Sequence, residues 1–306
     1  HLERGRVLAA LGRPTEARVA FEEAVRLAPD LPEARLRLGE VLFAGGDAAS
    51  AIPHLDRFVE QVPSSGVGFF LRARAHLAAG HRTAALADLQ KSTRLSPQDG
   101  NAHLFAAVVA IGEGDLASFE EFRRALRPLI ERKGPAAADL DAVDRFLGDE
   151  TRTGLARGVL LLEQSEGVEA VDALAETVTL SPRSHGAHLL LGVARMERDD
   201  FVAGRREFYL AIVYAVRNRR IEFAEAVLAR LADDPLWHGA GRIDVDAIGR
   251  EMGEDADVLF AKGLYLRETG RDALALATWE RCLELEPEYW LKDRIVELRK
   301  LLGKDG

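Results

Sequence analysis

The sequence of 306 residues is poor in cysteine, in tyrosine and in long apolar runs. Its one cysteine, Cys282, excludes an intrachain disulfide and a metal site built from paired cysteines. No apolar run reaches the length of a membrane span, and no signal-peptide pattern is present. The sequence begins at His1 rather than at a methionine, so the lack of a signal-peptide pattern does not indicate a location. We therefore expect either the cytoplasm or the periplasm. Strand-forming runs are scarce, which predicts an almost entirely helical protein.

An excess of basic charge is also lacking. The formal net charge is −9, and residues 1–100 carry 13 basic and 12 acidic side chains. Residues 251–288 carry 10 acidic and 4 basic side chains, and so hold much of the acidic excess. Neither half offers the basic face that phosphate binding requires, so we expect no nucleic-acid partner.

Signatures of catalysis and of cofactor binding are missing too. The sequence contains no nucleophile elbow and no Gly-rich phosphate loop after a strand, so we expect no enzyme activity and no cofactor. His185 and His188 lie three residues apart and can share a helix face, but no carboxylate or cysteine completes a metal-ligand set beside them. Cys282 occupies a position for a small core residue, which favours a buried, unreactive thiol.

Helix-forming residues are abundant, and they recur with a period of 34 residues. Small, large and proline residues keep a constant register over three successive copies, which is typical of a helix–turn–helix solenoid. The small residues let paired helices approach closely, and the large ones fill the space between neighbouring repeats. The copies hold Gly5, Gly12, Ala17, Phe21 and Pro29, then Gly39, Gly46, Ala51, Leu55 and Pro63, then Ala73, Gly80, Ala85, Leu89 and Pro97.

These residues resemble those of the tetratricopeptide repeat family over most of the chain. The resemblance implies an all-α, right-handed superhelical solenoid of antiparallel helix pairs. It also implies a non-enzymatic scaffold or adaptor that binds a peptide or a partner protein in its concave groove. The alternatives are a regulatory or substrate-recruiting module of a larger enzyme or secretion machine, and a self-associating protein. The high content of Ala, Arg and Leu suggests a bacterial source.

The period breaks in two places, which predicts the domain organisation. Residues 1–134 form an N-terminal block of three clear repeats and one degenerate repeat, and residues 135–150 form an inserted helix or linker. Residues 151–306 form a C-terminal block, with a loop insertion around 233–243 and a capping helix over 290–302. Trp237 and His238 in that loop either plug a gap in the stack or contact a partner.

The exposed positions of the first helix in each repeat predict the binding surface. Aromatic side chains there supply desolvated anchor area, and arginines supply forked donors for carboxylates. The alternative is that the apolar residues contact neighbouring helices and the arginines are solvated helix formers. The Lys and Asn side chains with which the family clamps a peptide carboxylate are absent from these positions. The predicted partner-binding residues are Arg6, Arg37, Glu40, Phe43, Phe70, Arg74, Leu77 and Phe105.

The corresponding face of the C-terminal block is far more apolar. So apolar a surface predicts a cover, which is the inserted helix, a second chain or a partner protein. The alternative is that the repeat register assigned to this block is displaced by one residue. The face comprises Leu155, Val159, Leu162, Leu189, Leu190, Val193 and Met196, with Glu163 and Glu197 nearby.

Overall fold

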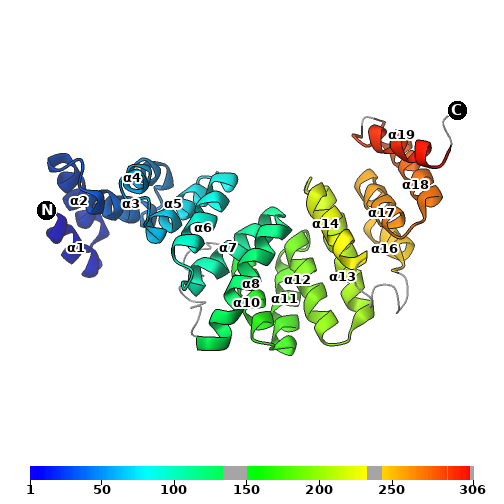
Figure 1. Cartoon of the computed structure of the whole chain (residues 1–306), viewed down its shortest axis with the longest axis horizontal. Coiled ribbons are helices and arrows are strands. Elements are labelled where there is room, and N and C mark those ends of the chain that lie inside the picture. The colour runs from blue at the N-terminus through cyan, green and yellow to red at the C-terminus, as the bar shows by residue number, and fades with distance from the viewer. Residues whose placement is uncertain (134–149, 233–242, 288, 304–306) are drawn as a thin grey trace. The chain divides into compact units, whose positions relative to one another are not determined.

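The computed structural model describes residues 1–133, 150–232, 243–287 and 289–303. Every regular element in these ranges is an α-helix, and successive helices pair into antiparallel hairpins (Figure 1). The all-α class and the helical-repeat architecture predicted from the sequence are thereby confirmed. None of the helices described is both long and apolar enough to cross a bilayer.

Within each described range the helices follow one another with short connections. They are α1 (Leu2–Ala10), α2 (Pro14–Leu27), α3 (Pro32–Ala44), α4 (Ala48–Gln61), α5 (Gly66–Ala78), α6 (Arg82–Leu95), α7 (Gly100–Glu113), α8 (Leu116–Lys133), α10 (Glu150–Glu163), α11 (Gly167–Leu180), α12 (His185–Glu197), α13 (Phe201–Arg217), α14 (Ile221–Ala232), α16 (Val245–Met252), α17 (Ala256–Glu268), α18 (Asp272–Leu285) and α19 (Lys292–Leu301).

The chain divides into two compact units. Unit 1 comprises His1–Ala106 with Arg124–Phe146, and unit 2 comprises Ala107–Arg123 with Leu147–Gly306. Unit 2 therefore includes the adjoining ends of α7 and α8. The predicted inserted helix and the Trp237–His238 loop lie outside the described residues, so the predicted domain boundaries remain a prediction.

In unit 1, local sequence signals set where the helices begin and turn. Pro14 is the first residue of α2, where its missing N–H leaves no hydrogen bond unmade. The carboxylate of Asp47 caps α4 by accepting a hydrogen bond from the backbone N–H of Ser50 at 3.1 Å, as the sequence predicts. Gly46 adopts a φ of +83° in the turn before Asp47, a conformation that favours glycine.

Close helix approach at glycine builds the hairpins of unit 1. A Cβ on Gly39 would lie 2.7 Å from Cγ of Leu55, so α3 and α4 reach this separation only because position 39 has no side chain. Leu38, Leu42 and Leu55 are buried in the resulting core. Arg72 of α5 adds polar contacts, donating to both carboxylate oxygens of Asp88 at 2.7 and 2.6 Å.

Unit 2 repeats this construction with larger side chains. A Cβ on Gly192 would lie 2.6 Å from the ring of Phe208, and one on Gly263 would lie 2.0 Å from Nε1 of Trp279. The indole N–H of Trp279 donates to the carbonyl of Phe260 at 3.2 Å, which satisfies a fully buried donor. Helix α13 has 17 residues and ends without a proline.

Two features at the C-terminal end differ in detail from the predictions. Helix α16 was not predicted; it begins after Asp244, whose carboxylate accepts from the backbone N–H of Ala247 at 2.8 Å. The capping helix is present as α19 and packs on α18. The sequence pattern puts Ile295, Leu298 and Leu301 on one side of this helix, but only Ile295 and Leu298 are buried, and Leu301 is 68% exposed.

Candidate functional site

Three of the predicted binding residues line one cavity in unit 1. Arg6 of α1 and Arg37 and Glu40 of α3 lie on successive first helices and border a cavity of about 430 Å³. Arg37 donates to Glu40 at 3.0 Å, and Glu33 lies 3.8 Å from both arginines. Because these groups are exposed and alternate in sign, each ion pair is weak and exchanges readily for a ligand charge.

Three other predicted residues form a stack next to them. The guanidinium of Arg74 lies over the ring of Phe43 at 4.6 Å and near that of Phe70 at 5.8 Å. Burial lowers the pKa of Arg74 to about 10, and nearby Glu40 opposes this fall. Arg74 therefore stays charged at neutral pH while its guanidinium is partly desolvated. Both phenylalanines are half-buried and keep part of their surface exposed.

The last two predicted residues lie below this surface. Phe105 is fully buried and meets the ring of Phe70 edge-on, with ring centres 5.4 Å apart. Leu77 is only 9% exposed. Both side chains pack beneath the surface in this conformation and are not accessible to a partner.

In unit 2, most of the apolar face predicted for the C-terminal block is packed inside the protein. Leu155, Val159 and Leu162 of α10 are at most 3% exposed. Leu189 and Leu190 of α12 are also buried. These residues of the face are therefore not open to solvent in the structure. What remains of it lines a cavity.

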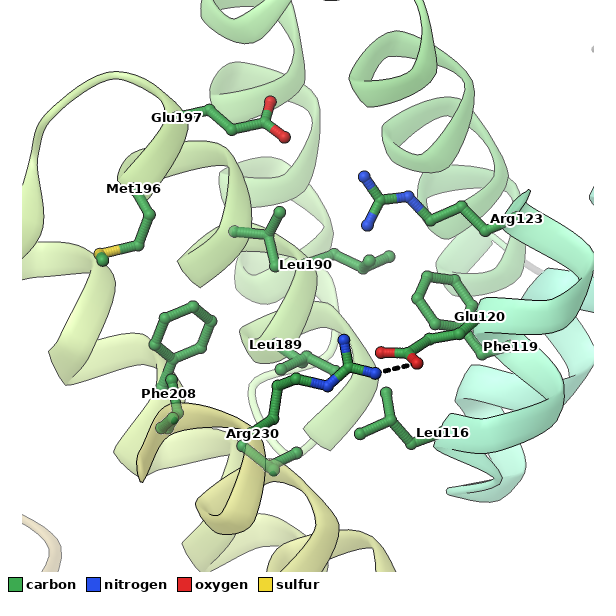
Figure 2. A pocket seen from close by; sticks show the side chains of 13 residues that line it. Leu116, Phe119, Glu120, Arg123, Leu189, Leu190, Met196, Glu197, Phe208 and Arg230 are labelled. Atoms are coloured by element: carbon green, nitrogen blue, oxygen red, sulfur yellow. Dashed lines mark hydrogen bonds and ion pairs between the residues drawn. The ribbon is translucent and has the colours of Figure 1, made fainter. Parts of the chain in front are cut away.

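That cavity measures about 530 Å³ and lies among α8, α12, α13 and α14 (Figure 2). Its wall is dominated by aliphatic and aromatic side chains, and its edge carries two acidic and two basic residues. This volume and lining are typical of sites that accept an apolar group. The lining residues are Leu116, Phe119, Glu120, Arg123, Leu189, Leu190, Val193, Met196, Glu197, Phe208, Val227, Arg230 and Leu231.

Ion pairs hold the cavity edge in place. Arg123 of α8 donates to Glu163, the last residue of α10, whose carboxylate is fully buried. Arg230 of α14 pairs with Glu120 of α8 across the cavity (Figure 2). Glu197 ends α12 on the exposed side and points toward the same space. Together these groups contribute three carboxylates and two guanidinium groups.

No pattern in the sequence indicated that α8 and α14 contribute to this site. Phe119 and Phe122 of α8 are out of register with the repeat, yet both are buried. Arg230 pairs with Glu120, which lies 110 residues earlier in the sequence, and no local sequence pattern predicts such a contact. The one available signal was the apolar stretch from Leu189 to Met196, whose last two apolar positions, Val193 and Met196, remain half-buried in the cavity.

The two histidines considered as metal ligands have structural partners instead. Nδ1 of His188 lies 2.6 Å from the carboxylate of Glu207, and Nε2 lies 2.9 Å from the carbonyl of Pro182. Nδ1 of His185 lies 3.2 Å from the side-chain nitrogen of Asn218. In the part of the chain that the structure describes, no three His, Cys, Asp or Glu side chains lie together as a metal site requires.

Cys282 is fully buried in α18. Its thiol donates to the backbone carbonyl of Ala256 at 3.3 Å, and burial raises the pKa of the thiol to about 12. The thiolate that nucleophilic chemistry needs is therefore scarce at neutral pH.

Comparisons with solved structures found proteins to which this chain is similar. A solved tetratricopeptide repeat protein from Parabacteroides merdae is 13% identical, with 98% of this chain and 96% of that chain covered and a TM-score of 0.41. The C-terminal part of a repeat-containing protein from Cytophaga hutchinsonii is 11% identical, with 97% and 99% covered and a TM-score of 0.42. YrrB, described as a protein of this class with an unusual peptide-binding site, is 14% identical, with 68% and 98% covered and a TM-score of 0.36.

The comparison with curated protein sequences gave no match. The sequence profile named "Tetratricopeptide repeat" matches residues 2–66, 70–138 and 155–220, which is more than half of the chain. These ranges contain the 34-residue register and the hairpins at Gly39 and Gly192, whereas the hairpin at Gly263 lies beyond them. The chain belongs to the tetratricopeptide repeat family.

Proposed function

We propose that this chain is a non-enzymatic scaffold that binds a peptide or a segment of a partner protein on the first-helix surface of unit 1. Tetratricopeptide repeats are typically protein-interaction modules without catalytic activity, which supports the general class. The specific surface is defined by Arg6, Arg37, Glu40, Phe43, Phe70 and Arg74, and we call it the arginine–phenylalanine surface.

One observation carries the proposal. Arg74 is held between Phe43 and Phe70 with its guanidinium 4.6 Å from the first ring, while both rings keep part of their area exposed. Aromatic and arginine side chains dominate the energy of protein interfaces, because they combine large apolar area with directional donors. A stack fixed before binding also reduces the entropy lost when a partner arrives.

The charges of this surface indicate what kind of segment it suits. Arg6 and Arg37 are paired only with exposed carboxylates, and such pairs contribute about 0–1 kcal/mol. A ligand carboxylate can therefore replace Glu40 or Glu33 at little cost. The surface suits a segment that places an apolar side chain on the phenylalanines and a carboxylate beside an arginine.

A pull-down from a lysate of the source organism tests the proposal. We expect the parent chain to retain a protein that the double variant Phe43→Ala, Arg74→Ala loses. Phe105 is left intact because its burial would confuse lost binding with lost folding. The matched control is Leu27→Ala, Leu95→Ala, which removes two exposed apolar side chains from α2 and α6.

The control should retain the same protein as the parent. If the double variant retains it too, with unchanged circular dichroism, the arginine–phenylalanine surface is not the binding site. Light scattering on the same samples checks self-association. A stable dimer that the double variant abolishes would replace a separate partner with a second copy of the chain.

A further inference from the structure

We propose that His188 and Glu207 form a pH-sensitive link between α12 and α13, in which the buried imidazole carries a proton on both ring nitrogens at neutral pH. We call this contact the His188–Glu207 link. It lies inside unit 2 and shares no residue with the arginine–phenylalanine surface. Loss of one proton as the pH rises removes the hydrogen bond that joins the two helices.

The hydrogen bonds of the ring decide where its protons are. Nε2 of His188 lies 2.9 Å from the carbonyl oxygen of Pro182, and Nδ1 lies 2.6 Å from Oε2 of Glu207. A carbonyl oxygen only accepts hydrogen bonds, so Nε2 carries a proton. A carboxylate also only accepts, so Nδ1 carries one as well. A neutral ring has one N–H for these two acceptors, and the imidazolium has both.

A second arrangement would satisfy the same contacts, with the proton on Glu207 and Nδ1 of His188 as its acceptor. Arg195 of α12 favours the first arrangement, because its Nη1 donates to Oε1 of Glu207 at 3.1 Å. A guanidinium group stabilises the ionised form of a carboxyl group that it contacts. The carboxylate thus accepts from two side chains of α12, one at each oxygen, and the second proton belongs to the ring.

The burial of the pair makes this proton important. The side chains of His188 and Glu207 are 5% and 8% exposed. A carboxylate in such a site is costly unless a cation and hydrogen bonds compensate it, and the imidazolium supplies both. The ring of Tyr214 is stacked on that of His188, with ring centres 5.1 Å apart, and the face of an aromatic ring attracts a cation at this distance.

The other charged groups around the link act on it more weakly. Arg195 opposes a second positive charge, but it contacts the far oxygen of Glu207 and is 25% exposed, so solvent screens it. Helices α10 and α11 also pack on α12, yet in the described residues neither gives His188 a hydrogen bond or an ion pair. The remaining ionisable residues of these helices are Glu150, Arg152, Arg157 and Glu163 on α10, Glu169, Asp172 and Glu176 on α11, His185 and Glu197 on α12, and Arg205, Arg206, Tyr209, Tyr214 and Arg217 on α13.

The link joins two helices that both line the cavity of unit 2. Helix α12 contributes Leu190 and Met196 to the wall, and α13 contributes Phe208. Without the second proton, lone pairs of Nδ1 and of the carboxylate face each other, and the link no longer holds the helices together. The folded chain binds this proton more tightly than the unfolded chain does. The stability that the link contributes is therefore present at and below neutral pH and declines as the pH rises.

Nitrogen NMR of the imidazole rings tests the assignment on the unaltered chain. A doubly protonated ring gives two similar nitrogen signals, whereas a neutral ring gives two widely separated ones. At neutral pH we expect the first pattern for His188. We expect the second for His185 in the same helix, because burial lowers the pKa of His185 to about 4. The neutral pattern for His188 at neutral pH overturns the proposal.

The variant Glu207→Gln separates the charge from the packing, because the two side chains have nearly the same size. We expect the ring of His188 in this variant to be neutral at neutral pH. In urea denaturation, the stability advantage of the parent over Glu207→Gln should shrink between about pH 6 and about pH 9. The matched control is Glu176→Gln, at an exposed carboxylate of α11, whose difference from the parent should stay constant.

An unchanged pattern for His185 in both variants shows that unit 2 is folded. The proposal is overturned if His188 stays doubly protonated in Glu207→Gln, or if the advantage of the parent does not shrink with pH. If Glu207→Gln does not fold, the spectrum of the parent still decides. The double variant Phe43→Ala, Arg74→Ala should give the parent pattern at His188, so failure of the function proposed for unit 1 is distinguishable from failure here.

Discussion

His185 shows how burial decides the chemistry of a single residue. From the sequence it is one of two histidines with metal-ligand spacing, whereas in the structure it packs edge-on against Phe223, 5% exposed. Desolvation lowers the pKa of His185 to about 4, and the charge of Arg220 adds to this fall. The neutral ring accepts a hydrogen bond from Asn218, which fits a structural role.

This pKa makes the stability of the protein sensitive to acid. The folded-state value lies below the ordinary value of 6.5, so the unfolded chain binds the proton first as the pH falls. Stability from neutral His185 is complete above pH 6.5 and declines as the pH approaches 4. We expect urea denaturation of the parent to lose roughly 2 kcal/mol more between pH 7 and 4.5 than that of His185→Gln. Equal losses would contradict the assignment.

The arginine–phenylalanine surface shows how far the sequence predicts individual binding residues. Repeat register predicts Phe43, Phe70 and Arg74 for one surface, and in the structure Arg74 contacts both rings. It predicts Phe105 for the same surface, whereas Phe105 is fully buried. Register gives the face of a helix, but the exposure of a residue on that face depends on helices that pack later in the chain.

At the scale of the element, the turn inside each hairpin described contains a residue with positive φ. The turn residue has positive φ at Gly12, Gly46, Gly80 and Gly114, spaced 34 residues apart. Later in the chain the same conformation also falls on non-glycine residues, including Ser165 at 61° and Asp199 at 59°, whereas the turn before α18 keeps a glycine at Gly270. An L-residue in this conformation costs about 1 kcal/mol, so these turns are less favourable than those of the first repeats.

These turn conformations predict that two substitutions at exposed turn positions change the free energy of unfolding in opposite directions. Gly46→Ala should lower the free energy of unfolding by about 1 kcal/mol, although a Cβ there would meet nothing within 4 Å. Ser165→Gly should raise it by up to about 1 kcal/mol, because glycine removes the strain. Urea midpoints followed by circular dichroism measure both. Two changes of the same sign would show that the turn conformation is not what sets the stability.

Elements with strong local signals could be predicted, and those defined by distant contacts could not. The 34-residue period predicted the helical hairpins that contain α2 to α6, since its small and large residues pack within one hairpin. Helix α16 has only eight residues and follows a break in the period, so no repeat position indicated it. The cavity was visible only as an apolar stretch on α12, because its other walls come from α8, α13 and α14.

At the scale of the whole molecule, the two units offer different surfaces. Unit 1 offers exposed arginines beside half-buried phenylalanines, which suits an apolar segment with carboxylates. Unit 2 offers an apolar cavity whose lining carries two acidic and two basic residues.

The central claim is that a partner sits on the first-helix surface of unit 1, and site-specific photo-crosslinking tests it most directly. A benzophenone amino acid replaces Ala44, which is exposed and lines the cavity with Arg6 and Arg37. A second protein carries it at Leu27, which is 57% exposed at the end of α2. The account predicts that illumination links the partner at position 44 and not at position 27. Links at position 27 alone, or equally at both positions, would contradict it.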